Sequence, residues 1–85
     1  MKEYNVIEIL VKKDENGKRV VTPIVAECDS FEEGFNCLKG TINAMGNVLE
    51  YTEADIRLNN LYGLFYNDKT GESATVCLKI PPTDN

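Results

Sequence analysis

Apolar and polar residues alternate along the first part of the chain, in a pattern typical of β-strands. Residues 4–13 are rich in β-branched side chains, and a second run of this kind covers residues 18–28. Between them, residues 14–17 (Asp-Glu-Asn-Gly) have the composition of a tight turn. Residues 2–28 are therefore predicted to form a β-hairpin. Pro23 has no N–H group, so its strand is expected at a sheet edge or to carry a bulge.

Residues 30–47 have the period of an amphipathic helix. Ser30, followed three residues later by Glu33, matches a capping box, in which each side chain bonds the other's free backbone N–H. Apolar side chains then recur at steps of three and four residues and fall on one stripe: Phe31, Phe35, Leu38, Ile42, Met45 and Leu49. We expect this stripe to pack against a sheet.

The rest of the chain predicts a short helix and a second hairpin. Thr52 and the acidic residues after it resemble a helix start, which gives a short helix over residues 52–59. Residues 61–80 are predicted to form a β-hairpin, and residues 81–85 a polar tail. The chain is therefore predicted to be a single α+β domain over residues 1–85, of order ββα(α)ββ. It has a four-stranded antiparallel sheet made of two hairpins, with one long helix packed on one face.

The predicted strands carry apolar side chains on both faces, although one helix covers only one face. On the first strand, Ile7, Ile9 and Val11 are predicted to face the helix. The residues expected on the uncovered face, as interface candidates, are Tyr4, Val6, Leu10, Tyr62, Leu64 and Tyr66. Large exposed apolar patches mark interaction sites, and tyrosine is enriched in interfaces. We expect a protein partner or a second copy, most simply in a homodimer; alternatively, the face curls or is covered by the short helix and the tail.

The chain is acidic: 9 basic and 14 acidic residues give its 85 residues a net charge of −5. This charge disfavours direct binding to nucleic acid or to an anionic membrane, because both attract Lys and Arg. It favours a basic partner, including a protein that itself binds nucleic acid. The candidate acidic surface consists of Glu32, Glu33, Glu50, Glu53 and Asp55. A net charge also keeps small proteins soluble, which is the alternative explanation.

The residues that usually carry catalysis or bind metal are scarce. The chain has no histidine, which excludes a histidine-based triad and the usual zinc sites. The three cysteines, Cys28, Cys37 and Cys77, show no CxxC spacing and are expected to be reduced and mostly buried. Neither a calcium loop nor a phosphate-binding loop is present. We therefore predict no enzyme activity, no catalytic residue, no cofactor and no metal site.

These observations predict a small acidic, non-enzymatic protein-binding or regulatory module. The chain starts without the apolar stretch of a signal peptide and has no run long enough to span a membrane, so a cytoplasmic location is expected. Compact acidic domains of this kind are often accessory proteins of phages or mobile elements, which act on basic or nucleic-acid-binding partners. The alternatives are a homo-oligomeric structural subunit of a larger assembly, and a small enzyme that uses a carboxylate or a thiol such as Cys77.

Overall fold

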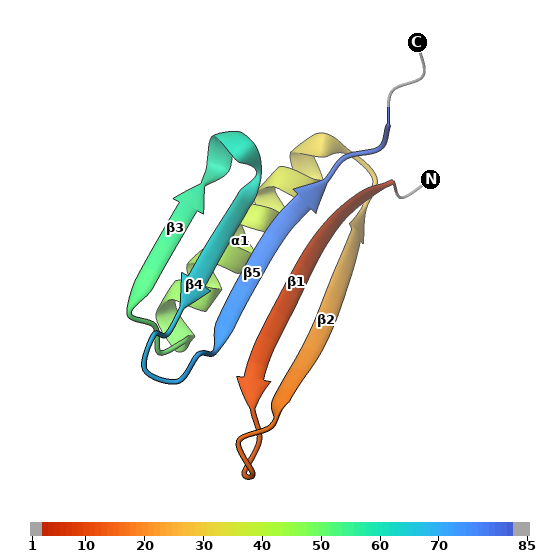
Figure 1. Cartoon of the computed structure of the whole chain (residues 1–85). Coiled ribbons are helices and arrows are strands. Elements are labelled where there is room, and N and C mark those ends of the chain that lie inside the picture. The colour runs from red at the N-terminus through yellow and green to blue at the C-terminus, as the bar shows by residue number, and fades with distance from the viewer. Residues whose placement is uncertain (1–2, 83–85) are drawn as a thin grey trace.

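The computed structural model describes residues 3–82 and shows an antiparallel sheet with one helix across one of its faces (Figure 1). The strands are β1 (Tyr4–Lys13), β2 (Arg19–Cys28), β3 (Glu53–Arg57), β4 (Tyr62–Tyr66) and β5 (Ser73–Lys79). The helix α1 spans Phe31–Val48, and a 3-10 turn, η1, spans Leu58–Asn60. The predicted α+β class, with a long helix on one face of an antiparallel sheet, is confirmed. The sheet, however, has five strands in the order β2-β1-β5-β4-β3, and not four.

The strand β5 lies in the middle of the sheet, between the β1–β2 hairpin on one side and the β3–β4 pair on the other. β5 pairs with β4 on one side and with β1 on the other, both antiparallel. β2 and β3 are therefore the two edges, and the predicted edge position of Pro23 is confirmed. The β1–β2 hairpin turns through residues 14–17, where Gly17 has a φ of 77° and its N–H donates to the Asp14 carbonyl over 3.0 Å. The predicted polar tail, 81–85, lies partly outside the described residues, which end at 82.

The predicted short helix over 52–59 is wrong, because residues 53–57 form the edge strand β3. Here charged side chains alternate with Ala54 and Ile56, and this two-residue period suits a strand that pairs with β4. An isolated helix of two turns would gain few hydrogen bonds for the residues that it fixes, whereas β3 extends an existing sheet. The tertiary pairing overrides the local helix-start pattern.

The long helix begins as predicted and ends one residue later than expected. Ser30 is the N-cap: its hydroxyl accepts a hydrogen bond from the N–H of Glu33 over 3.2 Å. The Glu33 carboxylate in turn accepts from the N–H of Asp29 over 3.1 Å, which closes the capping box one residue before Ser30. The helix stripe packs against one sheet face, and the buried core consists of Val6, Leu38, Ile42, Met45, Phe65, Ala74, Val76 and Leu78.

The faces of the first strand are the reverse of those predicted. Tyr4, Val6 and Leu10 lie on the helix side, where Val6 is 2% exposed and the other two pack against the core. Ile7, Ile9 and Val11 lie on the opposite side. Both sets are apolar, so the alternation along β1 alone could not orient the strand. The pairing with β5 does: it sets Val6 beside the core residue Leu78, and it sets the other three beside the small outward side chains of that strand.

The β1–β2 hairpin reaches beyond the helix, as Figure 1 shows. Along β2, only Cys28 at the helix end is buried. Ile24 on the helix side is 45% exposed, and its neighbour Val25 on the other side is 56% exposed. The overall dimensions of 47 × 21 × 21 Å reflect this projecting hairpin. The protein therefore displays apolar strand residues away from its core.

Candidate functional site

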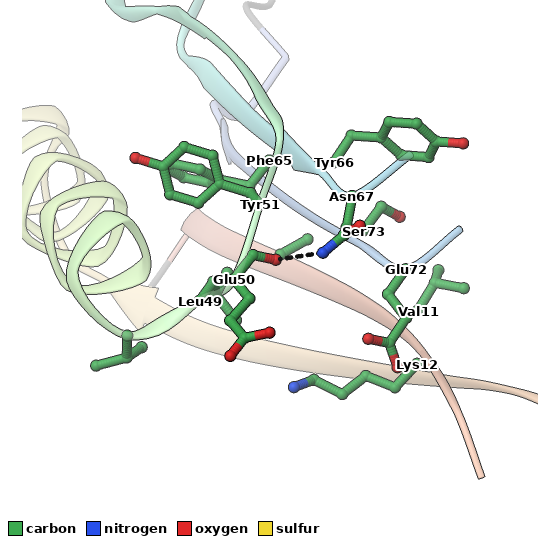
Figure 2. Close-up of a pocket in the computed structure, with 12 residues that line it drawn as sticks. Val11, Lys12, Leu49, Glu50, Tyr51, Phe65, Tyr66, Asn67, Glu72 and Ser73 are labelled. Carbon is green, nitrogen blue, oxygen red and sulfur yellow. Dashed lines mark hydrogen bonds between the residues drawn. The ribbon is translucent and has the colours of Figure 1, made fainter. Parts of the chain in front are cut away.

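A cleft of about 200 Å³ lies between the end of α1, the loop that follows it and the β4–β5 turn (Figure 2). Its wall combines aromatic residues such as Tyr51 and Phe65 with the charged residues Lys12, Glu50 and Glu72. The rings of Tyr51 and Phe65 pack edge to face with their centroids 4.9 Å apart. The cleft is smaller than the roughly 300–1,000 Å³ that is usual for small-molecule sites.

Asn67 is the central polar residue of the cleft and holds two loops together. It is 9% exposed, and its Nδ2 donates to the carbonyl of Glu50 over 3.2 Å, as Figure 2 shows. Its Oδ1 accepts from the backbone N–H groups of Lys69 over 3.0 Å and of Thr70 over 3.2 Å. The amide therefore ties the loop after α1 to the β4–β5 turn, and both its nitrogen and its oxygen have hydrogen-bond partners.

Other polar groups at this end of the sheet also have structural partners. The backbone N–H and the hydroxyl of Thr52 donate to the carbonyl of Tyr66 over 2.9 and 3.3 Å, and the same hydroxyl accepts from Asp68 N–H over 3.0 Å. Thr52 therefore fastens β3 to β4, and does not cap a helix as predicted. The Glu72 carboxylate accepts from the N–H of Lys13 over 2.9 Å. Within residues 3–82, no buried side-chain nitrogen or oxygen lacks a partner.

The cysteines are free thiols at three different places. Cys28 is 9% exposed at the end of β2. Burial raises the pKa of its thiol, and the neighbouring groups of Cys37, Glu33 and Asp29 raise that pKa further. At neutral pH, Cys28 is therefore a neutral thiol, which is a weak nucleophile. Partly buried Cys77 lies on the sheet face away from α1. Residues 3–82 contain no cluster of three Cys, Asp or Glu side chains placed to hold a metal ion.

The candidate acidic residues do not form one surface. Glu32 and Glu33 lie in the first turn of α1, and Glu50 lies beside the cleft near the other end of the helix. Glu53 and Asp55 lie on the edge strand β3. Asp55 is also bound to Arg57, whose Nε lies 3.0 Å from Asp55 Oδ1, and this hydrogen bond raises the pKa of the guanidinium. The five candidate carboxylates are thus spread over three places.

The sheet face opposite α1, which we call the open face, is crossed by three rows of side chains. The strand register sets the members of each row from β3 to β2. The Val11 row consists of Glu53, Tyr66, Ser73, Val11 and Val21; the Ile9 row of Asp55, Leu64, Thr75, Ile9 and Pro23; and the Ile7 row of Arg57, Tyr62, Cys77, Ile7 and Val25. Charges thus occupy the β3 edge, and apolar side chains occupy most of the remaining positions.

The open face presents an apolar band from β4 to β2, in which the middle strand β5 contributes the small side chains Ser73, Thr75 and Cys77. Val21 is 59% exposed, Ile9 41% and Tyr66 37%. With strands about 4.8 Å apart and rows about 6.8 Å apart, the band covers roughly 400 Å² in projection. Patches of that size on a monomer are often functional. On the helix side of the same hairpin, Glu8 and Lys12 interrupt the apolar residues of β1.

The sequence-based interface candidates are divided between the two faces. Tyr62, Leu64 and Tyr66 lie on the open face, whereas Tyr4, Val6 and Leu10 lie on the helix side. The open-face residues missed by sequence reasoning are Ile7, Ile9, Val11, Val21, Pro23 and Val25. The alternation along the last strand is the signal that could have found them. Its small or polar residues mark the face away from the helix, and the β1 residues paired with them lie on the same face.

Comparison with known proteins found no matching family model, no similar curated protein and no similar solved structure. In the part of the chain that the structure describes, no helix is long and apolar enough to cross a membrane.

Proposed function

We propose that this protein is a non-enzymatic protein-binding module and that the open face is its binding surface. The observation that carries the proposal is the apolar band, which no element within residues 3–82 covers. The helix α1 lies across the other face of the sheet, as Figure 1 shows. Burying such a band removes apolar surface from water, which is the main driving force of protein association.

The layout of the open face matches that of a protein interface. An interface typically has an apolar centre with aromatic residues and a polar rim. Here Leu64 and Ile9 lie in the central row, Tyr62 and Tyr66 flank Leu64 along β4, and charged side chains stand along β3. Tyr66 also lies next to Glu53, and this arrangement disfavours a nucleic-acid phosphate at that position. The proposal therefore rests on the apolar band and not on an acidic surface.

The test of this function uses two neighbouring residues of β2 that point to opposite sides. Val25→Asp places a charge on the open face, and the matched control Ile24→Asp places it on the helix side of the same exposed strand. We expect both variants to keep the circular dichroism spectrum of the wild type. Proteins captured by the tagged wild-type chain from its source cell should be lost with Val25→Asp and retained with Ile24→Asp. Equal capture by both variants would contradict the proposed surface.

A further inference from the structure

We propose that the partner seated on the open face is a second copy of this chain, turned by a two-fold axis that runs across the strands along the Ile9 row. This inference rests on the proposed function, because it names the occupant of the same face. Its basis is a symmetry in the sequence of the face itself. A closed homodimer needs a surface that is complementary to itself, since the same patch is contributed by both subunits.

The apolar rows are interchangeable under this rotation. The Ile9 row falls on its own copy, while the Val11 row falls on the Ile7 row of the partner. Val21 then faces a second Val25, and Tyr66 faces a second Tyr62. Along the centre of the band, the small side chains of β5 face each other. Apolar side chains therefore meet apolar side chains over β1, β2 and β4.

The β2 end of the charged border is complementary under the same rotation. Beyond the Val11 row, Arg19 lies on β2 next to Lys13. Beyond the Ile7 row, Glu27 of β2 lies in one row with Asn5 of β1 and Lys79 of β5. The rotation brings Arg19 opposite Glu27. It brings Lys13 opposite the uncharged Asn5, beside which Lys79 of β5 is a like charge, so the opposite-charge contact of this border lies at β2. Opposite charges that face each other across an interface fix its register and exclude other partners.

The β3 edge follows the same rule. Glu53 in the Val11 row comes opposite Arg57 of the second copy, because the two residues end the rows that the rotation exchanges. Asp55 in the Ile9 row comes opposite another Asp55, and each of these carboxylates keeps its own Arg57 at 3.0 Å. Each edge therefore gains opposite-charge contacts that outnumber the single like-charge pair.

Two other ways of joining two copies fit the structure less well. A two-fold axis along the strands would lay β3 on β2, with Asp55 over Pro23 and Glu53 over Val21, which buries charges against apolar side chains.

Joining two β2 edges would leave hydrogen bonds unmade at Pro23. The bond from Asp14 N–H to the Lys18 carbonyl sets the hairpin register, and it turns the nitrogen of Pro23 toward the free edge, where it has no proton to donate.

The open face has the size that a modest dimer needs. The apolar band and the border residues together span roughly 600 Å² of sheet per subunit, from the strand spacing and the rise along each strand. Standard specific interfaces bury about 800 Å² per partner. Sheets that pack face to face keep their strands within about 30° of each other, so the long side chains at the border remain within reach of their partners.

The test is a charge exchange between Arg19 and Glu27. These residues lie eight positions apart on β2, or about 26 Å, so they cannot meet within one chain. In the proposed dimer, Arg19→Glu or Glu27→Arg alone breaks two opposite-charge contacts and places like charges together. Each single variant should raise the dimer dissociation constant about tenfold in sedimentation equilibrium. The double variant, Arg19→Glu with Glu27→Arg, should restore the wild-type value within about threefold, because the contacts return with their signs exchanged.

Three outcomes would overturn the second copy as partner: a wild type that stays monomeric at millimolar concentration, a dimer that survives Ile9→Asp unchanged, or a double variant weaker than both single variants. The protein-binding function is judged separately by the capture experiment with Val25→Asp and Ile24→Asp. A monomeric wild type whose partners are lost only with Val25→Asp would refute the homodimer and support the binding module.

Discussion

At the scale of single residues, the polar contacts around the cleft stabilise the fold. Asn67 makes three hydrogen bonds that join the loop after α1 to the β4–β5 turn, in a site with little access to water. Leaving a buried polar group without a partner lowers the stability of the fold by more than a hydrogen bond adds to it. The identity of such a residue is therefore set by the fold, even where the residue binds nothing. The polar residues around the cleft are therefore explained by the loop conformation that they stabilise, and no ligand is needed to explain them.

We expect Asn67→Ala to lower the free energy of unfolding by about 2 kcal/mol, because the Glu50 carbonyl and two backbone N–H groups lose their partner. Urea denaturation followed by circular dichroism measures this change. The exposed neighbour Asp68 is the control, and Asp68→Ala should change stability by less than about 0.5 kcal/mol. Equal effects of the two substitutions would show that the amide does not hold the loops.

At the scale of elements, close contact between α1 and the sheet depends on glycine at particular positions. A Cβ on Gly34 would lie 2.7 Å from Cδ1 of Leu78, whereas a Cβ on Gly40 would meet nothing within 4 Å. Both residues lie inside the helix, where glycine is about 1 kcal/mol less favourable than alanine. Alanine substitutions at these two positions therefore distinguish the effect of helix propensity from the effect of packing within one helix.

Gly40→Ala should raise the free energy of unfolding by about 1 kcal/mol, because the helix gains propensity and the new methyl group points into open space. Gly34→Ala gains the same propensity but must displace the buried side chain of Leu78, so its stability should fall below that of Gly40→Ala by about 1–2 kcal/mol. Thermal and urea unfolding of both variants measure the difference. If both substitutions stabilise equally, the helix does not lie as close to Leu78 as the structure places it.

The elements that the sequence predicted well are those defined by local patterns. The capping box at Ser30 and the apolar stripe after it are contained within one helix, and the 14–17 turn within one hairpin. The two errors concern pairings between distant segments. Residues 53–57 look like a helix start until β4 is beside them, and the orientation of β1 depends on β5, more than sixty residues later.

At the scale of the whole molecule, the fold buries apolar residues under one helix and leaves a second apolar layer open. An exposed apolar sheet face could be predicted from the sequence, because more strand positions are apolar than one covered face can bury. Its residues could be foreseen only on β4, where Tyr62, Leu64 and Tyr66 alternate clearly with Gly63 and Phe65. On β1 and β2 both sides are apolar, and only the strand order shows which side α1 covers.

The proposed contact between the open faces of two copies can be followed by methyl NMR at increasing protein concentration. We predict that signals of Ile7, Ile9, Val21 and Leu64 shift between micromolar and millimolar concentration. Signals of the core residue Leu38 and of Ile24, on the helix side of β2, should stay in place. Spectra that do not change with concentration, or shifts that are confined to the helix side, would rule out this dimer.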